Sequence, residues 1–310
     1  MKEITILVPT YNEEKNIKEL YERLKNVFSE SLESYNCKIL FVDNDSKDNT
    51  QKIIRDLCKT DESVCAIFNA KNFGFARSQF NGLRESEGDA VIMLYADMQD
   101  PPEVIPKFVS AWEKGAKVVC GVKKNSRENP LMFLCRKAYY SLIKRITEID
   151  HISQFDGFGL YDRSFINVLK KCDDYLPYLR GIVAEFGQNR MEVSYTQEAR
   201  KRGKSSFHFL SLYDFAMLGI TSYSKVLMHL CTILGTLISF ASTAVATYTF
   251  IMKLLHWNSY SIGTAATQIG VFFLGSLQLF FIGFVGEYIV NINTRTMRHP
   301  IVIEKERINF

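Results

Sequence analysis

Apolar runs alternate with amphipathic segments along the first 121 residues of the chain. Five runs have the length and composition of buried strands, at residues 4–9, 38–43, 64–69, 90–95 and 116–122. Between these runs, apolar residues recur at helical spacing in 17–28, 48–58 and 75–84, and another helix is expected after Pro101 and Pro102. Strands that alternate with helices predict an α/β fold with a doubly wound, mainly parallel sheet. The runs are apolar almost throughout, as in strands that helices cover on both faces.

The pattern changes near residue 226. Residues 226–252 contain no Asp, Glu, Lys or Arg, and residues 264–293 contain only Glu287. Each stretch is long enough to cross a bilayer, which takes about 20 residues. With the short link 253–263 between them, they predict a two-helix transmembrane hairpin over 226–293. A pair of buried core helices is the alternative interpretation.

Basic residues flank the predicted hairpin on both sides. Lys225 precedes it, Arg295 and Arg298 follow it, and the link holds only Lys253. By the positive-inside rule, this bias places both ends and the N-terminal domain in the cytoplasm. Residues 208–225 are expected to form an amphipathic juxtamembrane segment, because their apolar residues lie on one face.

Composition narrows the function classes only slightly. The net charge of +4 is mild, so no nucleic acid partner is expected. The seven cysteines are odd in number and scattered, and they contain no Cys-x-x-Cys pair. A disulfide framework or a zinc site is therefore not expected, and a reducing compartment fits the chain better.

Acidic and amide side chains gather where three of the predicted strands end. The segments concerned are 9–13, 43–48 and 97–100. Ligands of open α/β sheets bind outside the carboxyl ends of the strands, so these segments would line one cleft. An oxygen-rich cleft suits Mg²⁺ or Mn²⁺, which in turn bind phosphates. Helix capping is the alternative for Asp48 and Asp100, since each precedes a helical segment.

The common phosphate-binding fingerprints are absent from the sequence. No Gly-x-Gly-x-x-Gly follows the first strand, and no Gly-x-x-x-x-Gly-Lys-Ser/Thr occurs. The chain instead resembles the membrane-bound polyprenyl-phosphate glycosyltransferases of family 2, which have the GT-A fold. The motifs that carry this resemblance occur in order: VPTYNE (8–13), VDNDSKDNT (42–50), NFG (72–74), ADMQDPPE (96–103), GFGLYDR (157–163), YLRG (178–181), RKRGKSS (200–206), VGEYI (285–289) and RHP (298–300). Dolichyl-phosphate mannose synthases and bacterial undecaprenyl-phosphate glucosyltransferases belong to this family.

The resemblance implies a site for a nucleotide-sugar donor. The residues that would contact its base and ribose are Pro9, Tyr11, Glu13 and Asp43. Asp97 and Gln99 would hold the divalent metal on the donor diphosphate. Asp156 lies beside GFGLYDR, near an acid expected to act in catalysis.

The resemblance also implies a site for phosphate groups of the donor or the acceptor. Arg200 would act in catalysis and in donor binding, and the wider phosphate site would comprise Arg200, Arg202, Lys204 and Ser205. The alternative is that this basic loop only anchors the chain to anionic lipid.

Three positions depart from the family pattern. Tyr95 stands where the metal motif Asp-x-Asp has its first acid. Residues 43–46 read Asp-Asn-Asp-Ser where Asp-Asp-Gly-Ser is usual, so the base contact could differ. Residues 205–207 read Ser-Ser-Phe in place of Ser-Lys-Tyr, and Lys204 or Arg202 would have to supply the missing cation.

These observations together predict a metal-dependent, inverting hexosyltransferase. It would move glucose or a related hexose from a nucleotide-sugar to a polyprenyl phosphate at the cytoplasmic face of the inner membrane. The expected parts are a GT-A catalytic domain at 1–207, the segment 208–225, the hairpin 226–293 and a cytoplasmic tail at 294–310. The same fold acting on another lipid or glycan, and a catalytically inactive membrane adaptor, are the alternatives. The sequence is compatible with a homo-oligomer and does not determine the oligomeric state.

Overall fold

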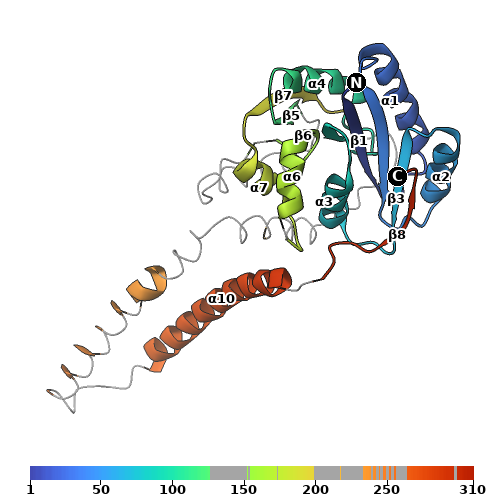
Figure 1. Cartoon of the computed structure of the whole chain (residues 1–310). Coiled ribbons are helices and arrows are strands. Elements are labelled where there is room, and N and C mark those ends of the chain that lie inside the picture. Colours follow the sequence, from blue (N-terminus) through green and yellow to red (C-terminus); the bar gives the residue numbers. More distant parts are fainter. Residues whose placement is uncertain are drawn as a thin grey trace.

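An eight-stranded mixed sheet organises the computed structural model of the chain (Figure 1). The structure describes residues 1–125, 152, 154–172, 174–198, 264–296 and 299–310, with scattered residues between 217 and 255. The strands are β1 (Glu3–Thr10), β2 (Asn36–Asp43), β3 (Val64–Asn69), β4 (Ala90–Met93), β5 (Val118–Asn125), β6 (Gly159–Asp162), β7 (Arg190–Thr196) and β8 (Glu304–Ile308). Their order across the sheet is β7-β5-β6-β4-β1-β2-β3-β8. The pairs β1–β2, β1–β4, β2–β3 and β5–β7 are parallel, whereas β6 and β8 run antiparallel to their neighbours.

Helices cover both faces of the sheet, as the apolar strands predicted. The helices are α1 (Ile17–Ser31), α2 (Thr50–Thr60), α3 (Phe75–Glu85), the 3₁₀ turn η1 (Pro102–Val104), α4 (Ile105–Glu113), α6 (Arg163–Lys171), α7 (Leu179–Phe186) and α10 (Thr264–Thr296). Helices α1, α2 and α4 pack on one face, and α3, α6 and α7 pack on the other. The doubly wound α/β interpretation is therefore confirmed.

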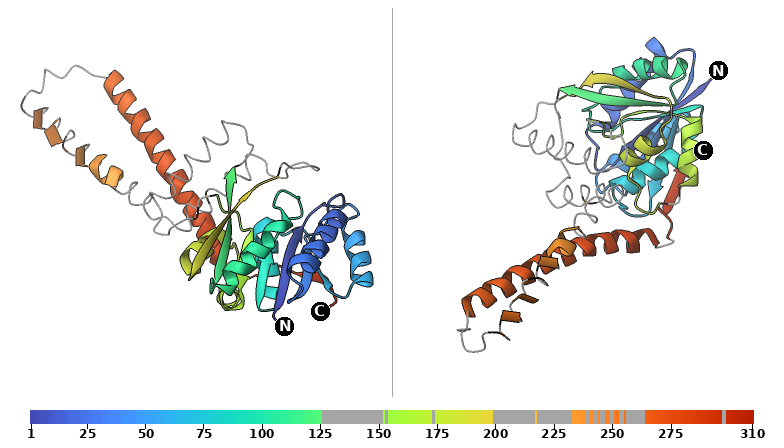
Figure 2. Two further views of the ribbon diagram at one scale, coloured as in Figure 1. Left: turned by 90° about the horizontal axis from the view of Figure 1, so that it is seen from above. Right: turned by 90° about the vertical axis from the view of Figure 1, so that its left-hand side faces the viewer.

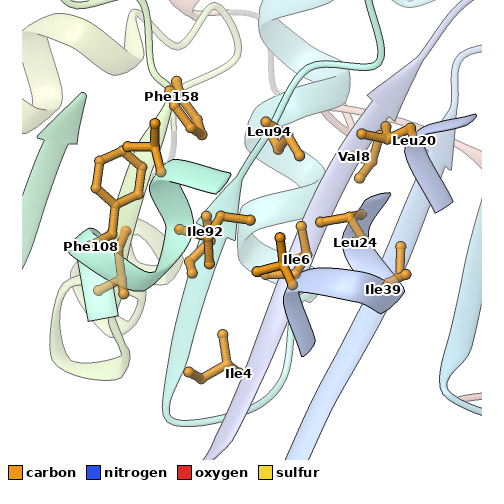
Figure 3. Packing of buried hydrophobic residues seen from close by; sticks show 14 of the residues in the cluster. Ile4, Ile6, Val8, Leu20, Leu24, Ile39, Ile92, Leu94, Phe108 and Phe158 are labelled. Atoms are coloured by element: carbon orange, nitrogen blue, oxygen red, sulfur yellow. The ribbon is translucent and has the colours of Figure 1, made fainter. Parts of the chain in front are cut away.

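The alternation of side chains along the strands divides the core into two layers. Ile4, Ile6 and Val8 of β1 point toward α1, where they meet Leu20 and Leu24 (Figure 3). Residues of the opposite parity pack with α3, α6 and α7 on the other face. Because both layers are fully buried, a shift of register by one residue would exchange the two cores.

The predicted strand and helix boundaries agree with the structure to within a few residues at most ends. The strand expected at 116–122 continues to Asn125, and the helix expected at 48–58 runs from Thr50 to Thr60. Asp48 accepts the N–H of Thr50 at 3.0 Å, but the residue that precedes α2 is Asn49, and no side-chain bond caps this helix. The capping interpretation is therefore not confirmed for Asp48. It is wrong for Asp100, whose carboxylate accepts the Tyr195 hydroxyl at 2.6 Å instead of capping a helix.

The two membrane helices expected over 226–293 are not supported by the structure. Taken over the described residues alone, no helix has the apolar length that a bilayer crossing requires. Helix α10 covers Thr264–Thr296 and extends away from the sheet domain, as both Figure 1 and Figure 2 show. Its C-terminal end returns to that domain, where Arg295 lies 3.2 Å from Asp174.

The segment 301–310 of the expected cytoplasmic tail, 294–310, is part of the sheet domain. Its last segment forms β8, which pairs antiparallel with β3 at the sheet edge (Figure 1). Arg307 pairs with Glu85 at 2.7 Å, and Glu306 pairs with Arg55 at the same distance. The Asn309 side chain donates to the backbone carbonyls of Cys58 and Val64, both at 2.8 Å. The chain therefore begins and ends in the same domain.

Asn309→Ala should lower the free energy of unfolding by about 2 kcal/mol. It removes two hydrogen bonds, each worth about 1 kcal/mol, and it places alanine at a positive φ of 60°. Urea unfolding followed by tryptophan fluorescence measures the change. Asn26→Ala, at an exposed position of α1, is the matched control and should change stability by less than about 0.5 kcal/mol. If the two variants have equal free energies of unfolding, the contacts of Asn309 beyond β8 do not stabilise the domain.

Candidate functional site

The three acid-rich segments meet at one edge of the sheet. Parallel pairing sets Thr10 of β1 opposite Asp43 of β2, and Leu7 of β1 opposite Met93 of β4. The loops that follow these strands therefore leave the sheet next to one another. The sequence-based prediction of a single polar edge is confirmed for the described residues, while the role of each side chain stays a prediction.

The loops after β1 and β2 are joined by hydrogen bonds. The backbone N–H of Asn12 donates to the Ser46 hydroxyl at 2.9 Å, and the N–H of Glu13 donates to the Thr50 hydroxyl at 2.8 Å. Asn12 takes a positive φ of 57°, a conformation that asparagine tolerates better than most residues. The two loops thus form one unit that carries Tyr11 at the surface, 37% exposed.

Two of the predicted base-contacting residues lie in the same unit. Pro9 is half-buried near the end of β1. The Glu13 carboxylate is half-buried and accepts the Asn16 side-chain amide at 2.6 Å. Each of these residues lies two positions from Tyr11 in the sequence, so one loop carries both an aromatic ring and a carboxylate.

Asp43 lies beneath these loops with no exposed surface. Its carboxylate accepts the Ser46 N–H at 3.0 Å, the Ser46 hydroxyl at 2.5 Å and the Gln51 amide at 2.8 Å. Burial raises the pKa of Asp43, and the bonds from Ser46 and Gln51 oppose this effect. In the described structure Asp43 fixes the loop between β2 and α2, and contact with a ribose stays a prediction.

Asn44, the departure from the usual Asp-Asp-Gly-Ser pattern, also supports a loop. Its side-chain oxygen accepts the Asn69 amide and the Phe73 N–H, both at 3.0 Å, and its side-chain nitrogen donates to Asn72 at 2.8 Å. These bonds shape the NFG segment that leads into α3. Asn44 is therefore a structural link between two loops of the site.

The segment after β4 folds back tightly on itself. Met98 has a positive φ of 61°, and the Gln99 N–H donates to the Asp97 carboxylate at 3.2 Å. The Gln99 side chain accepts from Gln197 at 3.4 Å, and its carbonyl accepts the Glu198 N–H at 2.9 Å. The two residues that follow β7 are therefore bonded to Gln99, one member of the predicted metal pair Asp97 and Gln99.

Asp100 is 1% exposed beside this pair. Burial raises the pKa of Asp100 well above its ordinary value, and the neighbouring Asp156 raises it further. Lys123 and the hydroxyl of Tyr195 counteract the shift. Burial and the neighbouring Asp156 therefore both favour the neutral form of Asp100.

Asp156 is held at its carboxylate by two donors. Lys123 of β5 lies 2.6 Å from one oxygen, and the Phe158 N–H donates to the other at 3.3 Å. Both side chains of the ion pair are mostly buried, with 11% and 21% exposure for Lys123 and Asp156. Lys123 could not be predicted from the sequence, because nothing in the local pattern of residues shows which acid lies opposite β5.

The basic loop predicted to bind phosphate lies outside the described residues. This applies to Arg200, Arg202, Lys204 and Ser205. The described chain before them stops at Glu198, which is bonded to the Gln99 carbonyl. Their roles stay predictions.

A divalent metal would find oxygen donors at the β4 exit. Within the described part of the chain, no group of three or more His, Cys, Asp or Glu side chains is arranged to hold a metal ion. Asp97 and Gln99 supply oxygen ligands only, which fits Mg²⁺ or Mn²⁺ better than zinc. Because Mg²⁺ keeps several waters and binds substrate phosphates, two protein ligands fit such an ion.

The comparisons with known proteins agree with this geometry. Residues 5–170, more than half of the chain, match the profile described as glycosyl transferase family 2. The chain belongs to glycosyl transferase family 2. The predicted family is therefore confirmed, and the chain is a glycosyltransferase.

Relatives of this family 2 glycosyltransferase match it over nearly their whole length. The bactoprenol glucosyl transferase of Shigella phage SfX is 30% identical over 98% of this chain and 99% of its own. The prophage bactoprenol glucosyl transferase homolog of Escherichia coli is 29% identical over 97% of this chain and 98% of its own. The similarity therefore includes the C-terminal third as well as the sheet domain.

A solved structure supports the GT-A-like fold. The TarS fragment 1–349 of S. aureus, crystallised with UDP-GlcNAc, gives a TM-score of 0.50 at 18% sequence identity. The alignment covers 72% of this chain and 66% of the fragment. At this identity the likeness concerns the fold alone, and it agrees with the mainly parallel sheet described above.

Proposed function

We propose that this family 2 glycosyltransferase moves glucose from UDP-glucose to a polyprenyl phosphate. The observation that carries the proposal is the full-length similarity to bactoprenol glucosyl transferases, which joins a GT-A-like domain to the C-terminal third. The sheet edge supports it, because its loops place an aromatic side chain, amides and carboxylates around one region.

The donor would lie across the ends of β1, β2 and β4. Tyr11, on the joined loops, offers its ring to the base, with Pro9 and Glu13 beside it. Asp43 would support the ribose side of this site, chiefly by fixing the loop through Ser46. Asp97 and Gln99 would hold Mg²⁺ or Mn²⁺, which would neutralise charge on the leaving diphosphate.

The protein has to position the acceptor, but it does not have to remove a proton from it. A phosphate monoester has a second pKa of about 6 and is largely ionised at pH 7. Its oxygen would attack the anomeric carbon in line, the bond from that carbon to the diphosphate would break, and the configuration would invert. Arg200, with Arg202, Lys204 and Ser205, would hold the phosphate groups and offset their charge.

Asp156 would orient the donor sugar or the acceptor. Its carboxylate is already paired with Lys123 at 2.6 Å, so it is fixed in place near Asp100. An ion-paired, mostly buried carboxylate suits orientation of hydroxyl groups through hydrogen bonds. We assign it this role ahead of strong proton abstraction.

The reaction would take place at the cytoplasmic face of a membrane, which in a bacterium is the inner membrane. Helix α10 supports this placement, because Leu279 is 71% exposed and Ile282 is 65% exposed. Leaving such side chains in water forfeits about 1.5–3 kcal/mol each, which lipid contact would restore. We therefore retain as proposals the catalytic domain 1–207, the juxtamembrane segment 208–225, the multi-pass hairpin 226–293 and cytoplasmic ends.

Membranes that contain the chain should transfer labelled glucose from UDP-glucose to added polyprenyl phosphate. Other nucleotide sugars, tested in parallel, should label the lipid at least about tenfold less. EDTA should stop the transfer, and added Mg²⁺ or Mn²⁺ should restore it. Asp97→Ala is the matched inactive control. If the label appears in a glycan or in another lipid, polyprenyl phosphate is not the acceptor. If no donor is turned over, the result supports the alternative that the chain is a catalytically inactive membrane adaptor.

Arg200→Ala should lower kcat/KM for polyprenyl phosphate at least about 100-fold. That loss corresponds to about 2.7 kcal/mol of transition-state stabilisation. Asp156→Asn should cost less, because the ionised acceptor needs charge balance more than a base. Both variants are measured at saturating donor. A near-normal Arg200→Ala beside an inactive Asp156→Asn would replace the phosphate argument with a base mechanism.

Cysteine labelling should place the link between the predicted membrane helices outside the cell. In a background without native cysteines, Ser259→Cys should react with an impermeant thiol reagent added to intact cells. Lys305→Cys, on β8 of the sheet domain, should react only after the membrane is opened. The reverse pattern, or protection of both positions in intact cells, would reject the hairpin.

A further inference from the structure

Tyr95 stands where the family pattern has the first acid of its metal motif, and it makes a different contact. Its hydroxyl donates to the backbone carbonyl of Asp156 at 2.8 Å. A longer contact joins it to the Gln79 side-chain oxygen at 3.4 Å. The residue that departs from the motif thus touches the segment that carries the predicted catalytic acid.

The turn at Gly157 packs directly on the tyrosine. Gly157 has a positive φ of 118°, and a Cβ placed there would lie 2.7 Å from the Tyr95 hydroxyl and 2.6 Å from the Met93 side chain. The Phe75 ring lies on Tyr95 as well, with 5.5 Å between ring centroids. The turn therefore has almost no space in which to move while the tyrosine is present.

Three described contacts hold Asp156 from two directions. Lys123 and the Phe158 N–H hold its carboxylate, and Tyr95 holds its carbonyl. The first two fix where the charge lies. The third fixes the backbone from which the side chain projects, so its loss would let the whole turn shift.

We propose that Tyr95 is a positioning residue that holds the Asp156–Gly157 turn, and with it the Asp156 carboxylate, against the exit of β4. The inference rests on the proposed function, since that function gives Asp156 its role. Tyr95 thereby connects two parts of the site, the predicted metal pair two and four residues along the chain and the acid that precedes β6.

The contact also explains why an acid would not serve at this position. A carboxylate in place of the phenol has no proton to donate to the Asp156 carbonyl. It would instead add negative charge beside that carbonyl and near Asp100 and Asp156. In this chain we therefore expect the acid of the family motif to impair the site.

A double-mutant cycle tests the proposal. Tyr95→Phe removes only the hydroxyl and should lower kcat about 10- to 100-fold, the scale of a misplaced catalytic group, with the donor KM changed less than about twofold. In an Asp156→Asn background the same change should cost less than about threefold, because the effect acts through Asp156. The Mg²⁺ concentration for half-maximal activity should stay unchanged, and Tyr95→Asp should be less active than Tyr95→Phe.

Tyr21→Phe is the matched control. Tyr21 lies on α1, and the substitution removes a hydroxyl that donates to the Asp61 carboxylate at 2.8 Å. It should leave kcat unchanged. Full additivity with Asp156→Asn, a tenfold rise in the Mg²⁺ requirement of Tyr95→Phe, or higher activity in Tyr95→Asp would each overturn the proposal. A purely structural role predicts equal losses in both backgrounds, which the cycle detects.

The cycle separates this inference from the acceptor assignment. It is measured twice, as transfer to polyprenyl phosphate and as hydrolysis of UDP-glucose without acceptor. If the wild type hydrolyses the donor but labels no polyprenyl phosphate, the acceptor assignment fails. Non-additivity in hydrolysis would then still support Tyr95 as a positioning residue, and additivity there would reject it.

Discussion

Parallel hydrogen bonding of β1 with β2 and β4 is the constraint on which the site depends. Once Thr10 lies opposite Asp43 and Leu7 opposite Met93, the following loops must emerge at one edge. Each parallel connection also needs a crossover, here a helix, so the three loops begin helices or turns there. The burial of both sheet faces fixes this register, because a shift of one residue would exchange the side chains of the two core layers.

The same constraint brings carboxylates together, and the structure offsets their repulsion with specific donors. An unpaired buried charge costs several kcal/mol, whereas a hydrogen bond to a charged group contributes about 1.5–3 kcal/mol. Asp43 has Ser46 and Gln51, Asp100 has Tyr195, and Asp156 has Lys123. The partners of Asp43 lie in the segment that follows it, whereas Asp100 and Asp156 each have a partner from a distant strand, which fixes their loops relative to the sheet.

Sequence periodicity predicted the elements whose signal is local. Strands β1 to β4 follow from continuous apolar runs, and the helices between them follow from apolar residues that recur with the helical period of 3.6 residues. The charged segment EKERI has no apolar run, so β8 could not be predicted, because its partner β3 lies more than 200 residues away in the sequence. Strand pairing at β5 and β6 decides the Lys123–Asp156 contact, and no local pattern reports that pairing.

The contacts of Asp156 bear on what kind of chemistry the site is built for. A general base must accept a proton, and for Asp156 this would weaken the ion pair with Lys123 at 2.6 Å. An acceptor that is already ionised makes no such demand, since its phosphate oxygen needs only to be held in line with the departing diphosphate. Lys123 and the Phe158 N–H hold the carboxylate, and Tyr95 holds the backbone carbonyl of the same residue, so Asp156 has the rigidity that orientation requires. The rigidity of this acid and the charge of the proposed phosphate acceptor are therefore consistent with one mechanism, in which the protein positions the reacting groups and the acceptor supplies an ionised nucleophile.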